Sequence, residues 1–363
     1  MLIVCIMVFN KTIVLFCEGD FCILEKDLHF GKVEWKQLLS RPDIGTFWIV
    51  LILIIVFTVF TDTFFTRFNI FNILRVASLY SFIALAQSSV TITRGVSLAI
   101  GAIGGFCGLV AGLLMEVAGW PIVPSLTIAI IAGVIIGYLH GLIITKLRLN
   151  AFVTTLATQF VLMGIVLGIT KGYPFVHLPS NITVLGRAGF GPIPYFAIFT
   201  ILVLVLTGYF FRYTATGRKI LATGGNIEAA HLSGVNVNAM VIYCHMLSGM
   251  FAGIAACLFT MRLGSIQANL GSDWVMMSFA VTVIAGNNDG KFSAFGVGMA
   301  ALMMVLIQNG LVMLHVDVYF EQAFIGGLIL FAISLDSIRM MSNEKTMLRQ
   351  VMAEGKINIR RKK

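Results

Sequence analysis

Apolar residues follow one another along this chain in long runs, and polar positions gather in the short stretches between them. A helix needs about 20 mostly apolar residues to cross the hydrocarbon core of a bilayer, and most of these runs approach that length. The runs do not alternate with polar residues as the strands of a membrane barrel would. The pattern predicts ten membrane helices, at residues 46–62, 72–92, 95–115, 122–145, 152–170, 193–211, 240–260, 275–286, 293–314 and 319–338.

Two parts of the chain fit this pattern poorly. The eighth run, 275–286, is short for a full crossing, so a re-entrant or tilted piece is an alternative there. Residues 1–45 begin with an apolar stretch that Asn10 and Lys11 interrupt, and no basic residue precedes it as in a signal peptide. We interpret 1–45 as an N-terminal extension, which is either a poor eleventh membrane segment or sequence translated from upstream of the true start.

The composition agrees with a protein that lies in lipid. Of the 363 residues, 58% are hydrophobic and only 11% are charged, and the mean hydropathy is +0.96. Soluble domains have about a quarter of their residues charged, so an ordinary soluble domain is excluded. The 36 glycines suit close packing between helices in a bilayer. We therefore predict an all-α polytopic membrane protein with about ten transmembrane helices.

Lys and Arg are unevenly distributed between the segments that join the predicted helices. With the N-terminus inside, the interior segments carry 20 basic residues and the exterior segments carry 5. Because basic loops are retained on the cytoplasmic side, both termini are predicted to be cytoplasmic. The transmembrane domain, 46–338, is followed by a basic cytoplasmic tail, 339–363, which holds eight of these residues. We expect this tail to face anionic membrane lipid and not to bind nucleic acid.

The chain offers few groups for catalysis. Its six His residues are scattered, and its six Cys residues form no CxxC pair. The sequence contains no HExxH motif, no GxSxG elbow and no phosphate-cradling GxxxxGK. We therefore predict no catalytic residue, no metal site, no cofactor and no ATP site in this chain, and we do not expect an enzyme.

The interior loop 212–239 carries the most informative motif. Asn226 is a good N-cap, Glu228 lies where a helix dipole favours an acidic side chain, and Gly234 is a good C-terminal stop. These residues predict a helix of two turns in the cytoplasmic loop. The helix is either a connector between two membrane helices or a lever that fits a groove on a partner.

Several motifs resemble one family of membrane proteins. Residues 228–234 read EAAHLSG, which resembles the coupling loop of ABC importer permeases. The wider matches are GGNIEAAHLSGVNV at 224–237, FNILR at 71–75, KLRLNAFVTTL at 146–156, MRLGS at 261–265, QAN at 267–269 and QNGL at 308–311. Together they resemble, over residues 68–338, the membrane subunit of ribose- and xylose-type monosaccharide importers in the branched-chain amino acid and sugar permease superfamily.

The resemblance implies a permease of the bacterial cytoplasmic (inner) membrane that pairs with a second permease chain, identical or related. ABC ATPase subunits would bind it inside, and an extracytoplasmic solute-binding protein would deliver the solute outside. ATP-driven movement of the ATPases would shift the permease between two access states. The residues that the resemblance places in the ATPase-coupling loop are Asn226, Glu228, Ala229, Ala230 and Gly234.

The chain departs from this family at two places. The family commonly reads TGGIDLSVG where residues 93–101 here read TRGVSLAIG, so Arg94 replaces a glycine and Ser97 replaces an acidic residue. A loop with a second glycine pair is shortened here to AGNNDGK at 285–291. These departures leave the solute open and favour a non-equivalent place for this chain in an unequal pair.

A small polar solute needs hydrogen-bonding groups along its crossing, so polar residues within the apolar runs are the candidates. Each of them has the alternative role of bonding a neighbouring helix, and Arg94 has the alternative of reaching the membrane interface. Arg94 and Ser97 are candidates for setting solute choice. The candidate solute pathway is Gln87, Arg94, Gly95, Ser97, Thr155, Gln159 and Asn309, with Thr91, Thr93, Thr158 and Gln308 as further members.

The first functional hypothesis is an ABC importer permease for a monosaccharide or a similarly small polar solute. The alternative within the same class is an importer for a nucleoside, a branched-chain amino acid or a furanosyl signal molecule. A secondary transporter is a further alternative, although ion coupling usually relies on intramembrane carboxylates and the middle of these runs has almost none.

Overall fold

The computed structural model describes residues 6–9, 12–17, 20–24, 42–61 and 63–314, and the isolated positions 320, 323, 326, 327, 330 and 334. The chain divides into two compact units, Met1–Arg41 and Pro42–Lys363.

The first unit contains a three-stranded antiparallel sheet in the order β1-β2-β3. Its strands are β1 (Ile6–Phe9), β2 (Thr12–Cys17) and β3 (Asp20–Leu24). No strand is predicted above for this N-terminal extension. Its apolar runs are short, and Asn10-Lys11 and Glu18-Gly19 separate them. Such spacing suits hairpins, because runs of four to six residues between polar pairs are too short for helices.

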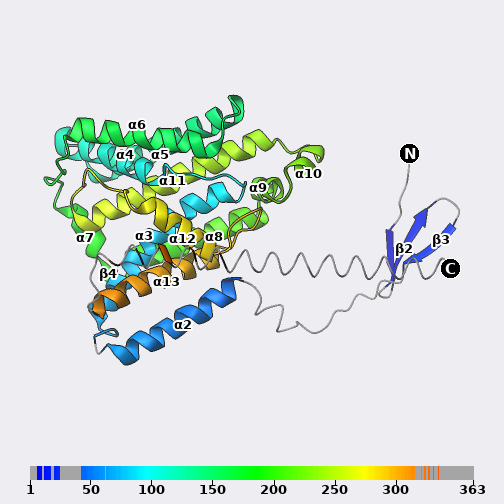
Figure 1. Ribbon diagram of the computed structural model, residues 1–363, viewed down its shortest axis with the longest axis horizontal. Coiled ribbons are helices and arrows are strands. Elements are labelled where there is room, and N and C mark those ends of the chain that lie inside the picture. The colour runs from blue at the N-terminus through cyan, green and yellow to red at the C-terminus, as the bar shows by residue number, and fades with distance from the viewer. Residues whose placement is uncertain are drawn as a thin grey trace. The chain divides into compact units, whose positions relative to one another are not determined.

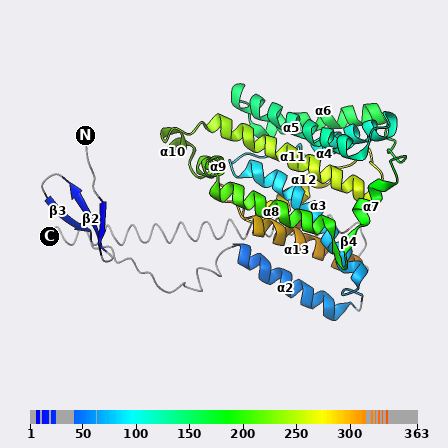
Figure 2. The same cartoon turned by 180° about the vertical axis from the view of Figure 1, so that it is seen from behind.

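The second unit is helical, with one short hairpin (Figures 1 and 2). Its elements in chain order are α2 (Pro42–Phe60), α3 (Arg67–Thr91), α4 (Ile100–Gly112), η1 (Leu113–Val117), α5 (Ile122–Lys146), α6 (Ala151–Thr170), α7 (Asn181–Arg187), β4 (Gly189–Phe190), β5 (Ile193–Pro194), α8 (Tyr195–Tyr213), α9 (Ala215–Gly225), α10 (Ile227–Leu232), α11 (Val237–Leu263), α12 (Trp274–Ile284) and α13 (Ala294–Met313).

Nine of the ten predicted membrane helices coincide with helices in the described part of the chain, and the tenth, 319–338, lies mostly outside it. Seven helical stretches there are long and apolar enough to cross a bilayer: α3, α4 with η1, α5, α6, α8, α11 and α13. Helices α2 and α12 are shorter apolar helices. The short eighth run is thus a helix of only 11 residues, and the architecture is that of an all-α polytopic membrane protein.

Helices α5 and α11 pack closely because glycines lie between them. A Cβ atom added to Gly133 would overlap the carbonyl oxygen of Gly249, and one added to Gly137 would overlap the carbonyl oxygen of His245. Small residues let two backbones approach in lipid, where packing and not the hydrophobic effect holds helices together. The glycine-rich runs therefore bring α5 and α11 into direct backbone contact.

Two membrane segments are interrupted by non-helical backbone. Residues 92–99 separate α3 from α4, and residues 264–273 separate α11 from α12. The two breaks meet, because a Cβ atom on Gly101 would overlap the carbonyl oxygen of Gly271 and the reverse is also true. The starts of α4 and α12 thus lie at one crossing of two backbones.

The 264–273 segment continues along one face of α4. A Cβ atom on Gly105 would lie 2.7 Å from the carbonyl oxygen of Leu270, and one on Gly108 would lie 2.9 Å from the Leu270 Cδ2 atom. Ile266, in the same segment, exchanges two backbone hydrogen bonds of 2.9 Å with Phe175. One side of the irregular backbone is covered by protein in this way, while Gln267, Asn269, Ser272 and Asp273 are exposed. Non-helical backbone within a membrane domain must be covered by protein or line a water-filled cavity.

The two ends of the helical unit carry different elements. Helices α9 and α10 lie at one end, and α7 and β4 lie at the opposite end, in both views (Figures 1 and 2). The loops 171–192 and 212–239 are therefore at opposite ends, which is the arrangement that the sequence-based topology requires.

Candidate functional site

Helix α10 is closed at both ends by local hydrogen bonds. Asn226 is its N-cap, and the side-chain Oδ1 atom accepts a hydrogen bond of 3.0 Å from the backbone N–H of Ala229. After the helix, Gly234 has a φ of +78°, and the N–H of Val235 donates to the carbonyl oxygen of Ala230 at 3.0 Å. This 6→1 bond across a left-handed glycine is a Schellman ending. Both caps are those predicted from the sequence.

Most of α10 faces away from the membrane helices. Ala230 is buried, with 4% of its surface exposed, and fixes the inner face of the helix. Glu228 and Ala229 are exposed, and Leu232 is 87% exposed. A leucine that is almost fully accessible on a rigidly capped helix at the end of the molecule is a surface suited to a protein partner.

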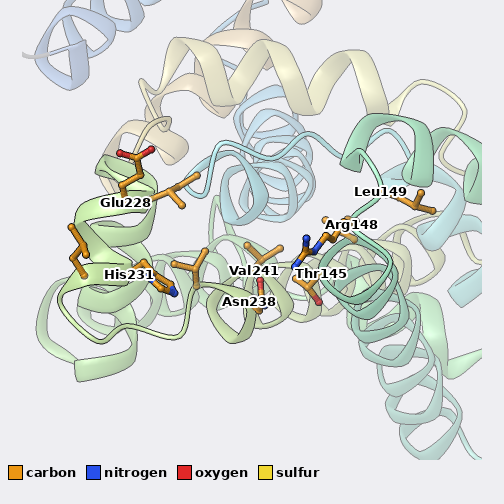
Figure 3. A pocket seen from close by; sticks show the side chains of 11 residues that line it. Thr145, Arg148, Leu149, Glu228, His231, Asn238 and Val241 are labelled. Carbon is orange, nitrogen blue, oxygen red and sulfur yellow. The ribbon is translucent and has the colours of Figure 1, made fainter.

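A groove separates α10 from the ends of α5 and α11 (Figure 3). Its volume is about 790 Å³. Glu228 and His231 lie on the α10 side, and Thr145 and Arg148 lie on the opposite side (Figure 3). The residues that line the groove are Ile144, Thr145, Arg148, Leu149, Ile227, Glu228, His231, Leu232, Val237, Asn238 and Val241.

Arg94 lies at the same end of the molecule, against the end of α9. Its Nε atom donates to the carbonyl oxygen of Gly224 and its Nη2 atom donates to that of Gly225, both at 2.8 Å. The Nε atom also lies 3.4 Å from the Asp289 Oδ1 atom. The backbone φ of Arg94 is +61°, a left-handed value that glycine adopts most easily, which gives a physical reason for a glycine at this position in the resembled family.

Two pathway candidates, Gln87 and Ser97, are buried within the helical unit. Gln87 in α3 is fully buried, and neither its Oε1 nor its Nε2 atom has a hydrogen-bond partner among the described residues. The Oγ atom of Ser97, in the 92–99 break, is also buried without such a partner. Buried polar atoms without partners are costly, so both positions stay candidates for contact with water or solute.

The threonine candidates bond to nearby backbone. Thr155 Oγ1 donates to the carbonyl oxygen of Ala151 at 2.8 Å and accepts from the N–H of Leu98 at 3.1 Å, which ties the 92–99 break to α6. Thr158 Oγ1 donates within α6 at 2.8 Å, and Thr93 Oγ1 donates to a carbonyl at the end of α3 at 3.0 Å. Their hydroxyl groups are used in helix packing and local structure.

Asn309 joins two helices. Its side chain exchanges two hydrogen bonds with the side chain of Asn69 in α3, at 2.8 and 3.1 Å. Asn69 was not among the sequence candidates, because only the packing of α3 against α13 makes it a partner. Asn309 therefore bonds a neighbouring helix, which is the alternative role given above for each polar candidate.

Gln159 lies beside the crossing of the two breaks. It lines a small cleft of about 30 Å³ with Gly101, Asn269 and Gly271. Gln159 comes from α6 and is partly exposed, and Asn269 comes from the 264–273 break. The cleft thus combines two side-chain amides with the start of α4. Asn269 is a further candidate that the polar-in-apolar pattern could not find, because it lies outside the predicted helices.

Residues 69–333 match the family described as the branched-chain amino acid transport system / permease component. This chain belongs to that family. The match runs from the first turn of α3 to beyond the end of α13. The protein is thus a multi-pass permease of the bacterial inner membrane.

Three curated permeases illustrate the similarity. The autoinducer 2 import system permease protein LsrC of Yersinia pseudotuberculosis (serotype O:3, strain YPIII) is 27% identical over 71% of this chain and 73% of its own. The ribose import permease protein RbsC of Haemophilus influenzae is 29% identical over 72% of this chain and 83% of its own. The galactose/methyl galactoside import permease protein MglC of Salmonella typhimurium is 29% identical over 72% and 84%. No solved structure matches this chain.

The family is one of transport components and not of enzymes. In the part of the permease that the structure describes, no three His, Cys, Asp or Glu side chains gather where they could hold a metal ion. The two candidate sites among the described residues are helix α10 with its groove and the cleft beside Gln159.

Proposed function

We propose that this permease is the membrane-spanning subunit of an ABC importer for a small polar solute, with a monosaccharide as the first candidate. The observation that carries the proposal is helix α10, which is capped at both ends and presents Glu228 and Leu232 outward at one end of the membrane domain. Relatives named for ribose and galactose import support the substrate class. The relatives named for autoinducer 2 import support that solute as the second candidate.

Helix α10 is the docking element for an ABC ATPase subunit in this proposal. Leu232 and Ile227 supply exposed apolar surface, at 87% and 43% exposure, and Glu228 supplies a charge. The adjacent groove, with Arg148 on its far side, gives room for a projecting element of the ATPase (Figure 3). Asn226, Ala229, Ala230 and Gly234 hold the helix in shape, and the ATPase provides the hydrolysis that this chain lacks.

The solute pathway passes the crossing of the two breaks. Discontinuous helices in transporters direct their N-terminal ends and free backbone groups toward a solute near the middle of the membrane. Here α4 and α12 both begin at the crossing, and Gln159 and Asn269 line the cleft beside it. A sugar hydroxyl is both donor and acceptor, so amide side chains suit it. A second permease chain completes the pathway, and a solute-binding protein delivers the solute at the α7 end.

An ion-coupled secondary transporter fits the structure less well. Among the described membrane helices from α3 to α13, the one acidic residue is Glu116 in η1. Its carboxylate accepts from the N–H of His177 at 2.9 Å and lies 3.5 Å from the His177 ring, at the end of the span. Ion coupling would need a carboxylate on the pathway, and energy from a partner ATPase removes that need.

We propose further that both termini and α10 are cytoplasmic, and labelling of single cysteines in intact cells tests this topology. In a variant with Cys5, Cys17 and Cys22 replaced by serine, Tyr173→Cys should react with a membrane-impermeant maleimide from outside. Ser233→Cys should react only after the cells are permeabilised, because it lies at the opposite end. Equal labelling of both positions from outside would contradict this orientation. The native Cys107, Cys244 and Cys257 are buried, so they provide a low background.

ATP-driven uptake in proteoliposomes tests the transport function and its pathway. The permease, assembled with ATPase and solute-binding partners, should import a radiolabelled pentose or hexose only with ATP inside. Gln159→Leu should lower uptake about tenfold, because one unmatched polar contact costs roughly 1–3 kcal/mol. Thr158→Val is the matched control on the same helix, since its hydroxyl bonds its own backbone, and should change uptake less than twofold. If the two variants change uptake equally, the proposal that the solute passes this cleft is rejected.

A further inference from the structure

Three segments meet at the end of the molecule where α10 begins, and we call their meeting place the interior junction. It consists of residues 91–94 after α3, the last residues of α9, 224–225, and the loop 287–290. The N–H of Gly290 donates to the carbonyl oxygen of Ile92 at 2.9 Å. A Cβ atom added to Gly224 would overlap that same oxygen and lie 2.6 Å from the nitrogen of Gly290. The three backbones are therefore in direct contact.

Arg94 connects these segments through its side chain. Its two donors occupy the carbonyl oxygens of Gly224 and Gly225 at 2.8 Å, and its Nε atom lies 3.4 Å from Asp289. The last carbonyls of a helix have no partner within the helix and carry the negative end of its dipole. The guanidinium group satisfies two of them at once and complements their charge. The end of α9 is thus bound by a side chain from the end of α3.

The residue after this contact is the N-cap of α10. Helix α9 ends at Gly225 and α10 begins at Ile227, and Asn226 between them is both the C-cap of α9 and the N-cap of α10. No flexible linker separates the two helices. A displacement of α10 therefore reaches Gly224 and Gly225 directly, and through Arg94 it reaches the end of α3.

Hydrogen bonds continue from the junction into α12. Thr91 Oγ1 donates to the carbonyl oxygen of Asn287 at 2.9 Å, and the Asn287 amide nitrogen donates to Ser88 Oγ at 3.2 Å. Ser88 Oγ lies 3.3 Å from Thr282 Oγ1, both side chains being buried. Thr282 lies near the C-terminal end of α12. The N-terminal end of this helix, Trp274, lies three residues after Gly271 at the crossing of the breaks. The contacts form a continuous physical connection from α10 to the crossing.

We propose that Arg94 is a positioning residue that transmits the movement of α10 to α3 and α12, and so couples the ATPase to the solute pathway. The inference rests on the proposed importer function and adds to it a residue and a route. It gives Arg94 a mechanical role in place of a role in solute choice. Both contacts of Arg94 with α9 are needed, because one hydrogen bond would allow the helix end to pivot about it.

Arg94→Gly removes the side chain with little harm to the backbone. The φ of +61° at Arg94 is disfavoured for a residue with a Cβ atom and is free for glycine. The variant therefore separates loss of the contact from loss of the fold. Arg218→Ala is the control. Arg218 also lies on α9, and its side chain donates to the carbonyl oxygen of Tyr213 at 3.3 Å, so the variant removes an arginine from the same helix without touching the interior junction.

The first measurement is hydrogen exchange of the permease alone in lipid nanodiscs. In Arg94→Gly the amides of residues 224–235 should exchange at least fivefold faster than in the wild type, with α5 and α11 unchanged. Arg218→Ala should change these rates less than twofold. Exchange of 224–235 at the wild-type rate in Arg94→Gly would overturn the proposal, and this result does not depend on the importer function.

The second measurement is the number of ATP molecules hydrolysed per solute imported by the complete complex in proteoliposomes. Arg94→Gly should raise this ratio at least fivefold while the ATPase subunits stay bound and solute preference stays the same. An unchanged ratio, a changed solute preference or loss of the ATPase from the complex would each overturn the transmitting role. Absence of ATP-driven uptake in the wild type would instead reject the importer function. The hydrogen-exchange result would still test the contact between Arg94 and α9, because it is measured on the permease alone.

Discussion

Leu232→Glu is expected to abolish ATP-driven uptake by this permease, with a loss of about a hundredfold. Leu232 is 87% exposed at the end of α10. Its substitution therefore removes little packing within the permease, whereas its whole apolar surface is available for contact with an ATPase subunit. Apolar anchors at the centre of an interface contribute roughly 2–4 kcal/mol, and 1.4 kcal/mol is a factor of ten in affinity. Binding of the ATPase subunits to the permease in nanodiscs, together with uptake, measures this loss.

Two controls isolate the apolar contact. Leu232→Met keeps volume and polarity and should retain uptake within about threefold. Ala215→Glu adds the same charge at the start of α9, where a helix N-terminus favours it, and should leave ATPase binding unchanged. Normal ATPase binding by Leu232→Glu, with normal amounts of permease in the membrane, would show that docking does not use α10.

Gly271→Ala is expected to destabilise the permease by roughly 2–4 kcal/mol and to stop uptake, because the crossing of the two breaks leaves no room for a methyl group. Its Cβ atom would overlap the carbonyl oxygen of Gly101, and its φ of +91° disfavours alanine. Forcing an atom into packed backbone costs about 1–3 kcal/mol, and the left-handed conformation adds about 1 kcal/mol. The midpoint of thermal unfolding in nanodiscs reports the change.

Gly172→Ala is the matched control. Gly172 has a similar φ of +79°, but nothing lies within 4 Å of its added Cβ atom. Gly172→Ala should therefore lower the free energy of unfolding only by the cost of placing alanine in a left-handed backbone conformation, about 1 kcal/mol. If the two variants unfold at the same temperature, the close approach of Gly101 and Gly271 does not limit stability, and the crossing is looser than its backbone contacts indicate.

The sequence by itself determined the elements whose signals are local. Apolar runs of near-membrane length predicted the membrane helices, since lipid requires each helix to be apolar along its whole length. These are α2, α3, α4, α5, α6, α8, α11, α12 and α13. The short helix α7 and helix α9, which carry no such run, were not predicted. The ends of α10 were predicted because Asn226 and Gly234 act within one turn of their own position. The β1–β3 sheet was not predicted, because its residues were interpreted as one interrupted apolar stretch and not as short runs that pair as hairpins.

Only the tertiary structure decided what the polar residues in the membrane domain do. Gln87, Arg94, Gln159 and Asn309 look alike in the sequence, as polar residues within or beside apolar runs. Packing gives Asn309 a partner in Asn69, gives Arg94 the end of α9, and leaves Gln159 beside the crossing of two broken helices. A hydrogen bond depends on which helices become neighbours. The glycine contacts that bring the helices together join residues far apart in the sequence, such as Gly101 and Gly271, which are 170 positions apart.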